Sequence, residues 1–292
     1  MDFGITLVKN EDIDRKRWDS AVSQTPYCSL FGYSWYLDNI CSTWDALISK
    51  DYQHVMPIPV FEGHYQQMQQ YLLWMGIYGS EIPTNEETEA FLNSIPENYN
   101  GLYLNLNKLC NVSNVENGLI HHEKVYQIDL LQPYKNRKFQ TPATLNNKYT
   151  IDVKQCASFF LVNNYKTESV LYFQLLKEVK QRGYCMIFAL ANSDKIILGC
   201  AVLFISQTEI YLTDISINKN QKDYKSIKNE LLDTIINYYS GKNFTFYIKT
   251  NKRGAYDSFD AETLELFDAT PYPHIYYIRN NISKLFNFFN IK

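Results

Sequence analysis

Two stretches of this chain carry the same order of hydrophobic patterns. Each has two short apolar segments around a polar break, a third apolar segment, an amphipathic segment and a last apolar segment, which predicts three strands, a helix and a strand. The segments are Trp44–Lys50, Val55–Phe61, Tyr71–Tyr78, Glu86–Ile95 and Leu102–Asn107, then Met186–Asn192, Ile196–Ile205, Glu209–Ile217, Ser226–Tyr239 and Phe244–Lys249. The dipeptide Tyr71-Leu72 recurs as Tyr211-Leu212, 140 positions later. The repeat predicts two similar α/β units that meet at a cleft, and chance alternation of strands and helices is the competing explanation.

The division between these units is expected near residue 118. The segment Asn111–Gly118 is polar and has no periodicity, which is typical of a linker, and Lys124–Leu130 then alternates as a strand does. A chain of 292 residues is long enough for two domains of ordinary size. We therefore predict an N-terminal unit at 1–118 and a C-terminal unit at 119–292.

Composition and charge narrow the function classes. With 46% hydrophobic residues, 24 Tyr and 17 Phe, the chain can build substantial cores. A formal net charge of −3 argues against a DNA-binding protein held by bulk electrostatics. No run approaches the ~18 apolar residues of a membrane span, and Met1–Lys16 does not resemble a signal peptide. These features predict a cytoplasmic protein.

The sequence offers no metal site and no familiar catalytic motif. The six cysteines contain no C-x-x-C pair, which fits neither a zinc site nor a disulfide scaffold. In His121-His122-Glu123, neighbouring side chains of a strand would point to opposite faces, so we expect no metal there. No nucleophile elbow, Walker loop or dinucleotide fingerprint is present, so the hydrolase, NTPase and dehydrogenase classes have no support.

Local signals predict further elements in the first half. Ile5–Lys9 reads as a strand, Asn10 as the cap of a helix that begins with Glu11 and Asp12, and Tyr33–Ile40 as a second helix. Thr84 is expected to cap the helix from Glu86, with Glu87 as its capping-box partner.

Two prolines constrain the strand Val55–Phe61. Pro57 and Pro59 lack N–H groups on the same lateral edge of the strand, so no regular ladder can form on that edge. Either this is an edge strand or the sheet splays apart beside it. In the second half, the stripe Leu171, Leu175, Leu176 and Val179 predicts a helix over Glu168–Arg182 that ends at Gly183.

The order of these segments resembles the acyl-CoA N-acyltransferase fold of the GNAT superfamily. Two such units in tandem are similar to the Fem-type aminoacyl transferases and their bacterial relatives. The resemblance covers nearly the whole chain and is carried by Trp18, Tyr33-Ser34-Trp35-Tyr36-Leu37-Asp38, Trp44-Asp45-Ala46-Leu47, Val55-Met56-Pro57-Ile58-Pro59 and Leu266-Phe267-Asp268-Ala269-Thr270-Pro271. It implies an α/β (α+β) fold of two tandem GNAT-like units, each a mixed, mostly antiparallel sheet with flanking helices.

The resemblance places acyl-CoA binding in the loop before Ser226–Tyr239. The GNAT pattern there is Arg/Gln-x-x-Gly-x-Gly/Ala, whose glycines let backbone N–H groups approach the pyrophosphate. This chain has Gln221 but departs from the pattern at Tyr224 and Ser226, and Asp223 would repel a phosphate. Three lysines offer partial compensation: Lys219, Lys222 and Lys225. We therefore expect no tightly bound cofactor and weak binding of acyl-CoA as donor.

A second departure concerns the tyrosine that protonates the leaving thiolate in relatives. Leu264 stands in its place, and Asp268 replaces the glycine of the closing motif. Asn251 matches an asparagine that often precedes this tyrosine. Residues 255–262 look like an insertion, from which Tyr256 could supply a displaced hydroxyl; a surface tyrosine is the alternative.

Acyl transfer to an amine needs a base and donors for the developing oxyanion. Asp214 interrupts the apolar strand Glu209–Ile217 and is our candidate base, with a hydrogen-bonded structural Asp as the alternative. The backbone N–H groups of Ile217 and Asn218 are the candidate donors to the oxyanion or to pantetheine. The sequence thus suggests an N-acyltransferase with its donor site in the C-terminal unit and a small-molecule or peptide-like amine acceptor in the cleft. The alternative is a non-catalytic binding or assembly protein on the same scaffold.

Overall fold

The computed structural model describes two compact units. Residues up to Glu123, with the segment from Pro273 on, form the first unit, and Lys124–Tyr272 form the second. Strands β6 (Leu119–Asp129) and β12 (Thr270–Arg279) each contribute residues to both units. The residues described are 3–27, 30–99, 102–106, 110, 112, 115–116, 118–134, 147–163, 169–218, 220–221, 223–249 and 259–279.

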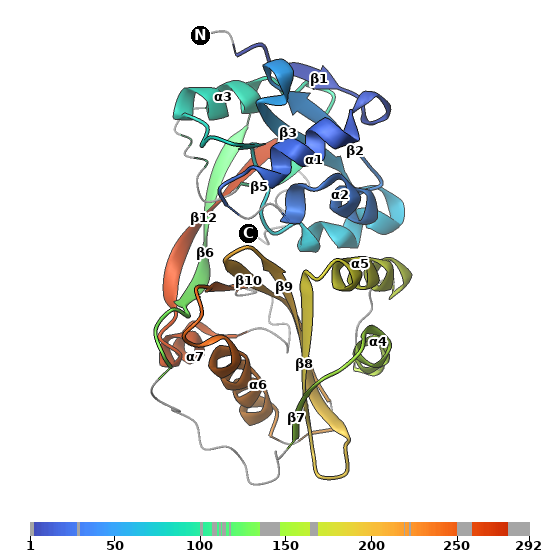
Figure 1. The fold of residues 1–292 in the computed structure, drawn as a ribbon, viewed down its shortest axis with the longest axis vertical. Coiled ribbons are helices and arrows are strands. Elements are labelled where there is room, and N and C mark those ends of the chain that lie inside the picture. The colour runs from blue at the N-terminus through green and yellow to red at the C-terminus, as the bar shows by residue number, and fades with distance from the viewer. Residues whose placement is uncertain are drawn as a thin grey trace, which may run out of the picture. The chain divides into compact units, whose positions relative to one another are not determined.

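The first unit is built around a four-stranded antiparallel sheet in the order β1-β2-β3-β4 (Figure 1). Helices α1 and α2 pack against these strands. Its helices and strands are β1 (Thr6–Val8), α1 (Arg15–Ser23), α2 (Ser34–Ile40), β2 (Thr43–Ile48), β3 (His54–Val60), β4 (Tyr78–Gly79), α3 (Asn85–Asn93) and β5 (Leu102–Leu106).

The prolines of β3 act as predicted. β3 pairs with β2 from Val55 to Val60, and both Pro57 and Pro59 lie in that ladder. On its other edge, β3 pairs with β4 only at His54 and Val55, before the first proline. The predicted strand Tyr71–Tyr78 is therefore wrong: a 3₁₀ helix runs to Tyr71, and β4 has only two residues. With its N–H donors missing, this edge of β3 cannot support a longer partner.

Of the two predicted helix caps, Asn10 is wrong and Thr84 is confirmed. Asn10–Asp12 forms a single 3₁₀ turn, and α1 begins later, where the Asp14 side chain accepts from the N–H groups of Lys16 and Arg17. Thr84 does cap α3 by accepting from the Glu87 N–H. The Glu87 carboxylate, however, lies 2.7 Å from Nδ1 of buried His54.

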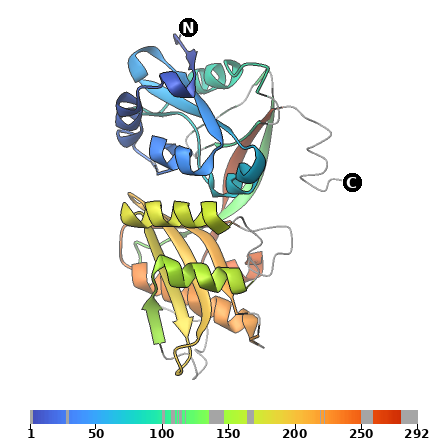
Figure 2. The same cartoon turned by 90° about the vertical axis from the view of Figure 1, so that its right-hand side faces the viewer.

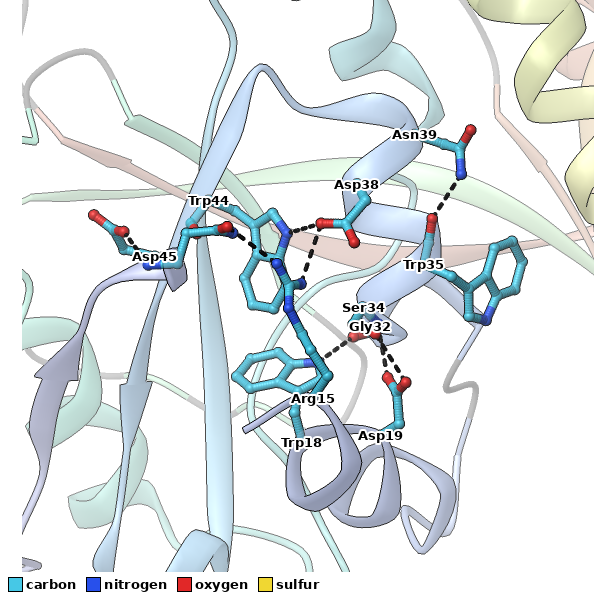
Figure 3. Close-up of polar contacts among 11 residues, drawn as sticks. Arg15, Trp18, Asp19, Gly32, Ser34, Trp35, Asp38, Asn39, Trp44 and Asp45 are labelled. Atoms are coloured by element: carbon cyan, nitrogen blue, oxygen red, sulfur yellow. Dashed lines mark hydrogen bonds and ion pairs between the residues drawn. The ribbon is translucent and has the colours of Figure 1, made fainter. Parts of the chain in front are cut away.

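The residues that carry the family resemblance in the first unit, Trp18 and residues 33–38, 44–47 and 55–59, are called the N-terminal signature below. Several of them make structural contacts between helices and strands of the first unit (Figure 3). The Trp18 indole donates to the Gly32 carbonyl at 2.8 Å. The Asp19 carboxylate accepts from both the N–H and the hydroxyl of Ser34, at 2.8 Å each, which fixes the start of α2 against α1. These contacts, buried at Trp18 and partly buried at Asp19, join α1 to the chain at the start of α2.

A second set of contacts in the same frame ties β2 to α2. The Asp38 carboxylate accepts from the Trp44 indole at 2.8 Å and from Arg15 at 3.1 Å, while the Arg15 guanidinium lies 4.6 Å from the centre of the Trp44 ring. Trp44 also packs on Trp18, with ring centres 4.8 Å apart. The signature residues thus have a structural explanation.

The second unit has helices on both faces of its sheet. In Figure 2, α4 and α5 (yellow-green) lie in front of the strands and α6 (orange) lies behind them. Its helices and strands are β7 (Asn147–Thr150), α4 (Val153–Val162), α5 (Ser169–Gln181), β8 (Cys185–Ala191), β9 (Ile197–Ser206), β10 (Glu209–Ile217), α6 (Tyr224–Tyr239), β11 (Thr245–Lys249) and α7 (Ala261–Leu266).

The strand order of the larger sheet is β5-β12-β6-β11-β10-β9-β8-β7. The β10–β11 pair is parallel, and the other pairs with a described register are antiparallel. The apolar stripe of α6, including Leu231, Leu232 and Ile235, forms a core with the strands beneath it. In each unit, two helices precede a hairpin, a third strand, a helix and a strand. The fold class is α/β, as predicted; the larger sheet is mixed and mostly antiparallel, whereas the described pairs of the four-stranded sheet are all antiparallel.

Candidate active site

Strand β10 carries a β-bulge at the centre of the second unit. The register with β9 shifts between Leu212 and Asp214, so Thr213 is the extra residue, and its hydroxyl donates to the Val202 carbonyl at 3.1 Å. Before the bulge Ile210 faces the α6 core, and after it Ile215 faces the same core. Because the extra residue shifts the alternation, Asp214 points to the opposite face.

Asp214 is buried and has a tyrosine partner. The hydroxyl of Tyr172 on α5 donates to Asp214 Oδ2 at 2.7 Å, and the two residues are 2% and 5% exposed, respectively. The sequence pointed to Asp214 as a carboxylate that needs a partner. The stripe of α5 shows that position 172 faces inward, but nothing in it shows that this tyrosine meets Asp214.

The backbone of β10 offers N–H groups at one edge. The N–H of Asn218 donates to the Leu198 carbonyl at 2.8 Å, so alternation directs the N–H groups of Ile217 and Ile215 away from β9. On that side, the pairing with β11 described by the structure ends at Leu212 and Ile248. Ile217 thus keeps the orientation expected of a donor. The N–H of Ile215, next to Asp214 in the strand, has the same orientation, and sequence reasoning did not single it out.

The prediction that the Asn218 N–H donates to the oxyanion or to pantetheine needs correction, because this N–H already donates to the Leu198 carbonyl of β9. Its side chain organises the loop instead: Oδ1 accepts from the Asn220 N–H at 3.0 Å. The Asn218 carbonyl accepts from the Gln221 N–H at 3.0 Å. Asn218 therefore shapes the turn that leaves β10.

The start of α6 is already capped by a carboxylate. Asp223 is the N-cap, and its side chain accepts from the Ser226 N–H at 3.4 Å. A bound phosphate would compete with this carboxylate for the positive end of the helix. Lys225 is exposed in the first turn, whereas buried Lys228 lies over the Phe259 ring at 4.9 Å from its centre. Lys225 is therefore the better placed of these two lysines to meet an anion.

Four predicted site residues lie outside the described part of the chain: Lys219, Lys222, Asn251 and Tyr256. The structure therefore adds nothing on their roles. Leu264, at the position where the family resemblance implies a tyrosine, is fully buried in the α6 core. Among the described residues, no group of three or more His, Cys, Asp or Glu side chains could hold a metal ion. No helix within the described ranges is long and apolar enough to cross a membrane.

Asp268, at the position where the closing motif of the resemblance has a glycine, follows the C-terminal end of α7. Asp268 has φ 61°, in the left-handed region that favours glycine. Its N–H bonds to the Glu265 carbonyl, and the N–H of Ala269 bonds to the Leu264 carbonyl. This is a Schellman ending, so the backbone keeps a glycine-type conformation without the glycine.

Comparisons with known proteins relate this geometry to solved structures. No protein-family model matches the chain, and no curated protein matches it. FemX superposes with a TM-score of 0.55 at 10% identity, over 94% of this chain and 98% of that one. A GNAT-family acetyltransferase from Colwellia psychrerythraea gives 0.54 at 9% identity, over 96% and 100%. A tandem GNAT protein from the clavulanic acid biosynthesis pathway gives 0.53 at 8% identity, over 94% and 98%.

At this level of identity the likeness shows the fold alone. The coverage extends over nearly the full length of both chains in each comparison. The shared order of helices and strands in the two units agrees with the tandem neighbour. The chain therefore has a GNAT-like, Fem-like fold of two tandem units, as the resemblance implied.

Proposed function

We propose that this chain is an N-acyltransferase whose chemistry belongs to β10 of the second unit. The observation that carries the proposal is the bulged strand: it presents a buried carboxylate and, one residue on, a backbone N–H directed to the edge that β11 does not cover. The neighbours named as an acetyltransferase and as FemX support this class of reaction. An amine acceptor and an activated acyl donor, such as acyl-CoA, are the proposed substrates.

In this proposal Asp214 accepts the proton of the attacking amine. The Tyr172 hydroxyl holds the carboxylate in place by donating to Oδ2. The N–H of Ile215, or of Ile217, donates to the acyl oxygen as negative charge develops on it. General-base catalysis contributes about 10²–10⁴-fold to a rate, and an oxyanion donor contributes on a similar scale.

The test is the variant Asp214→Asn, which keeps the side-chain volume and removes the base. With acetyl-CoA, a panel of amines and release of free thiol as the readout, we expect the rate to fall about 10²–10⁴-fold while the melting temperature stays close to wild type. The matched control is Tyr172→Phe, which keeps the carboxylate and should lose less activity. A folded Asp214→Asn protein with wild-type activity would remove Asp214 from the mechanism, and loss of soluble protein would make it structural.

A second candidate is a non-catalytic binding or assembly protein on the same scaffold. It is favoured by the Asp223 cap at α6 and by the buried Leu264 in place of the proton-donating tyrosine of relatives. This candidate predicts no thiol release with any amine and no binding of acyl-CoA. The two functions are therefore separated by the same assay together with a binding titration.

A further inference from the structure

Two cysteines of the second unit lie in contact across different elements. Cys156 on α4 and Cys200 on β9 have their Sγ atoms 3.6 Å apart, and both residues are fully buried. All the described cysteines are free thiols. Cys156 and Cys200 meet in the fold although 44 positions separate them in the chain.

This contact is close to what a disulfide requires. An S–S bond is about 2.05 Å long, so the sulfurs need to approach by roughly 1.5 Å. Cys200 belongs to a strand whose neighbours on both sides are hydrogen-bonded, β8 and β10. Cys156 belongs to a surface helix of ten residues whose end exposes Leu161 and Val162. The movement is therefore expected in α4, since a surface helix shifts or opens more readily than a central strand.

We propose that Cys156 and Cys200 are an oxidative modification site that forms a disulfide between α4 and β9. With a small-molecule disulfide such as oxidised glutathione, the Cys156 thiolate attacks one sulfur and releases one thiol, which leaves a mixed disulfide. The Cys200 thiolate then displaces the second thiol. Two protein thiols are oxidised, the small disulfide is reduced to two thiols, and the protein loses two hydrogen atoms.

The reaction requires α4 to open first. Burial raises the pKa of the Cys200 thiol well above its ordinary value, and contact with Cys156 and the charge of Asp214 add to this. Because the thiolate is the attacking species, the protein should react only slowly with the oxidant before α4 opens. Oxidation should accordingly accelerate in urea concentrations too low to unfold the chain.

The experiment incubates the full chain with oxidised glutathione, with and without sub-denaturing urea, and maps the linked peptides by mass spectrometry. We expect a Cys156–Cys200 link, with the loss of two hydrogen atoms, and a higher melting temperature for the oxidised protein. Cys156→Ala should show neither the link nor the higher melting temperature. Cys185→Ala, a buried cysteine of the same unit, should show both.

Other outcomes overturn the proposal. A Cys156–Cys185 link would show that the contact does not select the partner. The absence of any link to Cys156 in the folded, urea-treated protein would show that α4 does not bring the two sulfurs to bonding distance.

Discussion

The third strand differs most between the two units. In the first unit, β4 has two residues and pairs with β3 at only two positions. In the second, β10 has nine residues and pairs with strands on both sides. The prolines of β3 explain the short strand, since they remove the donors a longer partner would need. The same order of elements thus gives a two-residue edge strand in one unit and a long, bulged strand in the other.

The polar residues of the two units differ in the same way. In the first unit, Asp19, Asp38 and Asp45 accept several hydrogen bonds each from neighbouring elements. In the second, Asp214 accepts a hydrogen bond from Tyr172 and follows the last residue of β10 that pairs with β11 in the described register, Leu212, by two positions. The carboxylates of the first unit thus tie its elements together, whereas Asp214 follows a β-bulge in β10, where we propose that the chemistry takes place.

The largest expected effect is on the stability of the first unit. Trp44→Ala should lower the free energy of unfolding by about 3–5 kcal/mol, because a buried indole is lost and Asp38 loses a donor. Denaturant unfolding measures this, with Trp35→Ala, a partly exposed neighbour in the same signature, as the control with a smaller loss. A Trp44→Ala protein of normal stability but without transferase activity would instead place the signature in the active site.

A smaller effect is expected at the Asp45 carboxylate. Burial alone would raise the pKa of Asp45, but hydrogen bonds from Lys9 and Tyr99 outweigh it and lower this pKa below its ordinary value. Tyr99→Phe should cost about 1.5–3 kcal/mol at neutral pH, as expected for a hydrogen bond to a charged group.

The pH dependence of the stability lost in Tyr99→Phe shows whether the hydrogen bond to the Asp45 carboxylate is its cause. A lowered carboxyl pKa stabilises the fold fully above the unfolded value of ~3.9, and this stabilisation is lost as the pH falls through the folded value. The difference between wild type and Tyr99→Phe should therefore shrink below about pH 4. A difference that stays constant from pH 7 to pH 3, or one that persists in an Asp45→Asn background, would refute the assignment.

The smallest expected effect is a change in stability at Asp268. It tests whether this departure from the glycine of the closing motif has a functional role. Asp268→Gly should stabilise the protein by about 1 kcal/mol, because glycine adopts the left-handed conformation without a steric penalty. Asp268→Ala should be less stable than the glycine variant. Thermal unfolding compares the three proteins. If Asp268→Gly were less stable than wild type, the Asp268 side chain would have a role of its own.

Much of the fold follows from local sequence patterns. The limits of β10 were predicted to the residue, and the apolar stripes located α5 and α6. The helix α4 was missed, although Asp152 and Gln155 form a capping box at its start. The prediction of a strand over Tyr71–Tyr78 is wrong because it rests on the apolar run alone and leaves out Pro57 and Pro59, which already show that one edge of the neighbouring strand lacks N–H donors.

The candidate site was less accessible to sequence reasoning. A polar residue in an apolar strand drew attention to Asp214. Its partner Tyr172 lies 42 positions away in the chain and is one of 24 tyrosines. Only the packing of α5 on the sheet therefore identifies the pair. The bulge at Thr213 decides the face that Asp214 occupies. In a strand that is mostly apolar, the alternation of apolar and polar residues does not reveal such a bulge.

The most direct test of the account is a calorimetric titration of the full chain with acetyl-CoA at low and high salt, beside an acetyl-CoA-binding protein of the same fold. We predict weak binding that fades as salt is added, because Asp223 occupies the start of α6 and exposed lysine charges are screened. Loss of one hydrogen bond to a charged group corresponds to roughly ten- to hundred-fold in affinity. Absence of binding at every salt concentration, under conditions where the control protein binds, would contradict a donor site in the second unit.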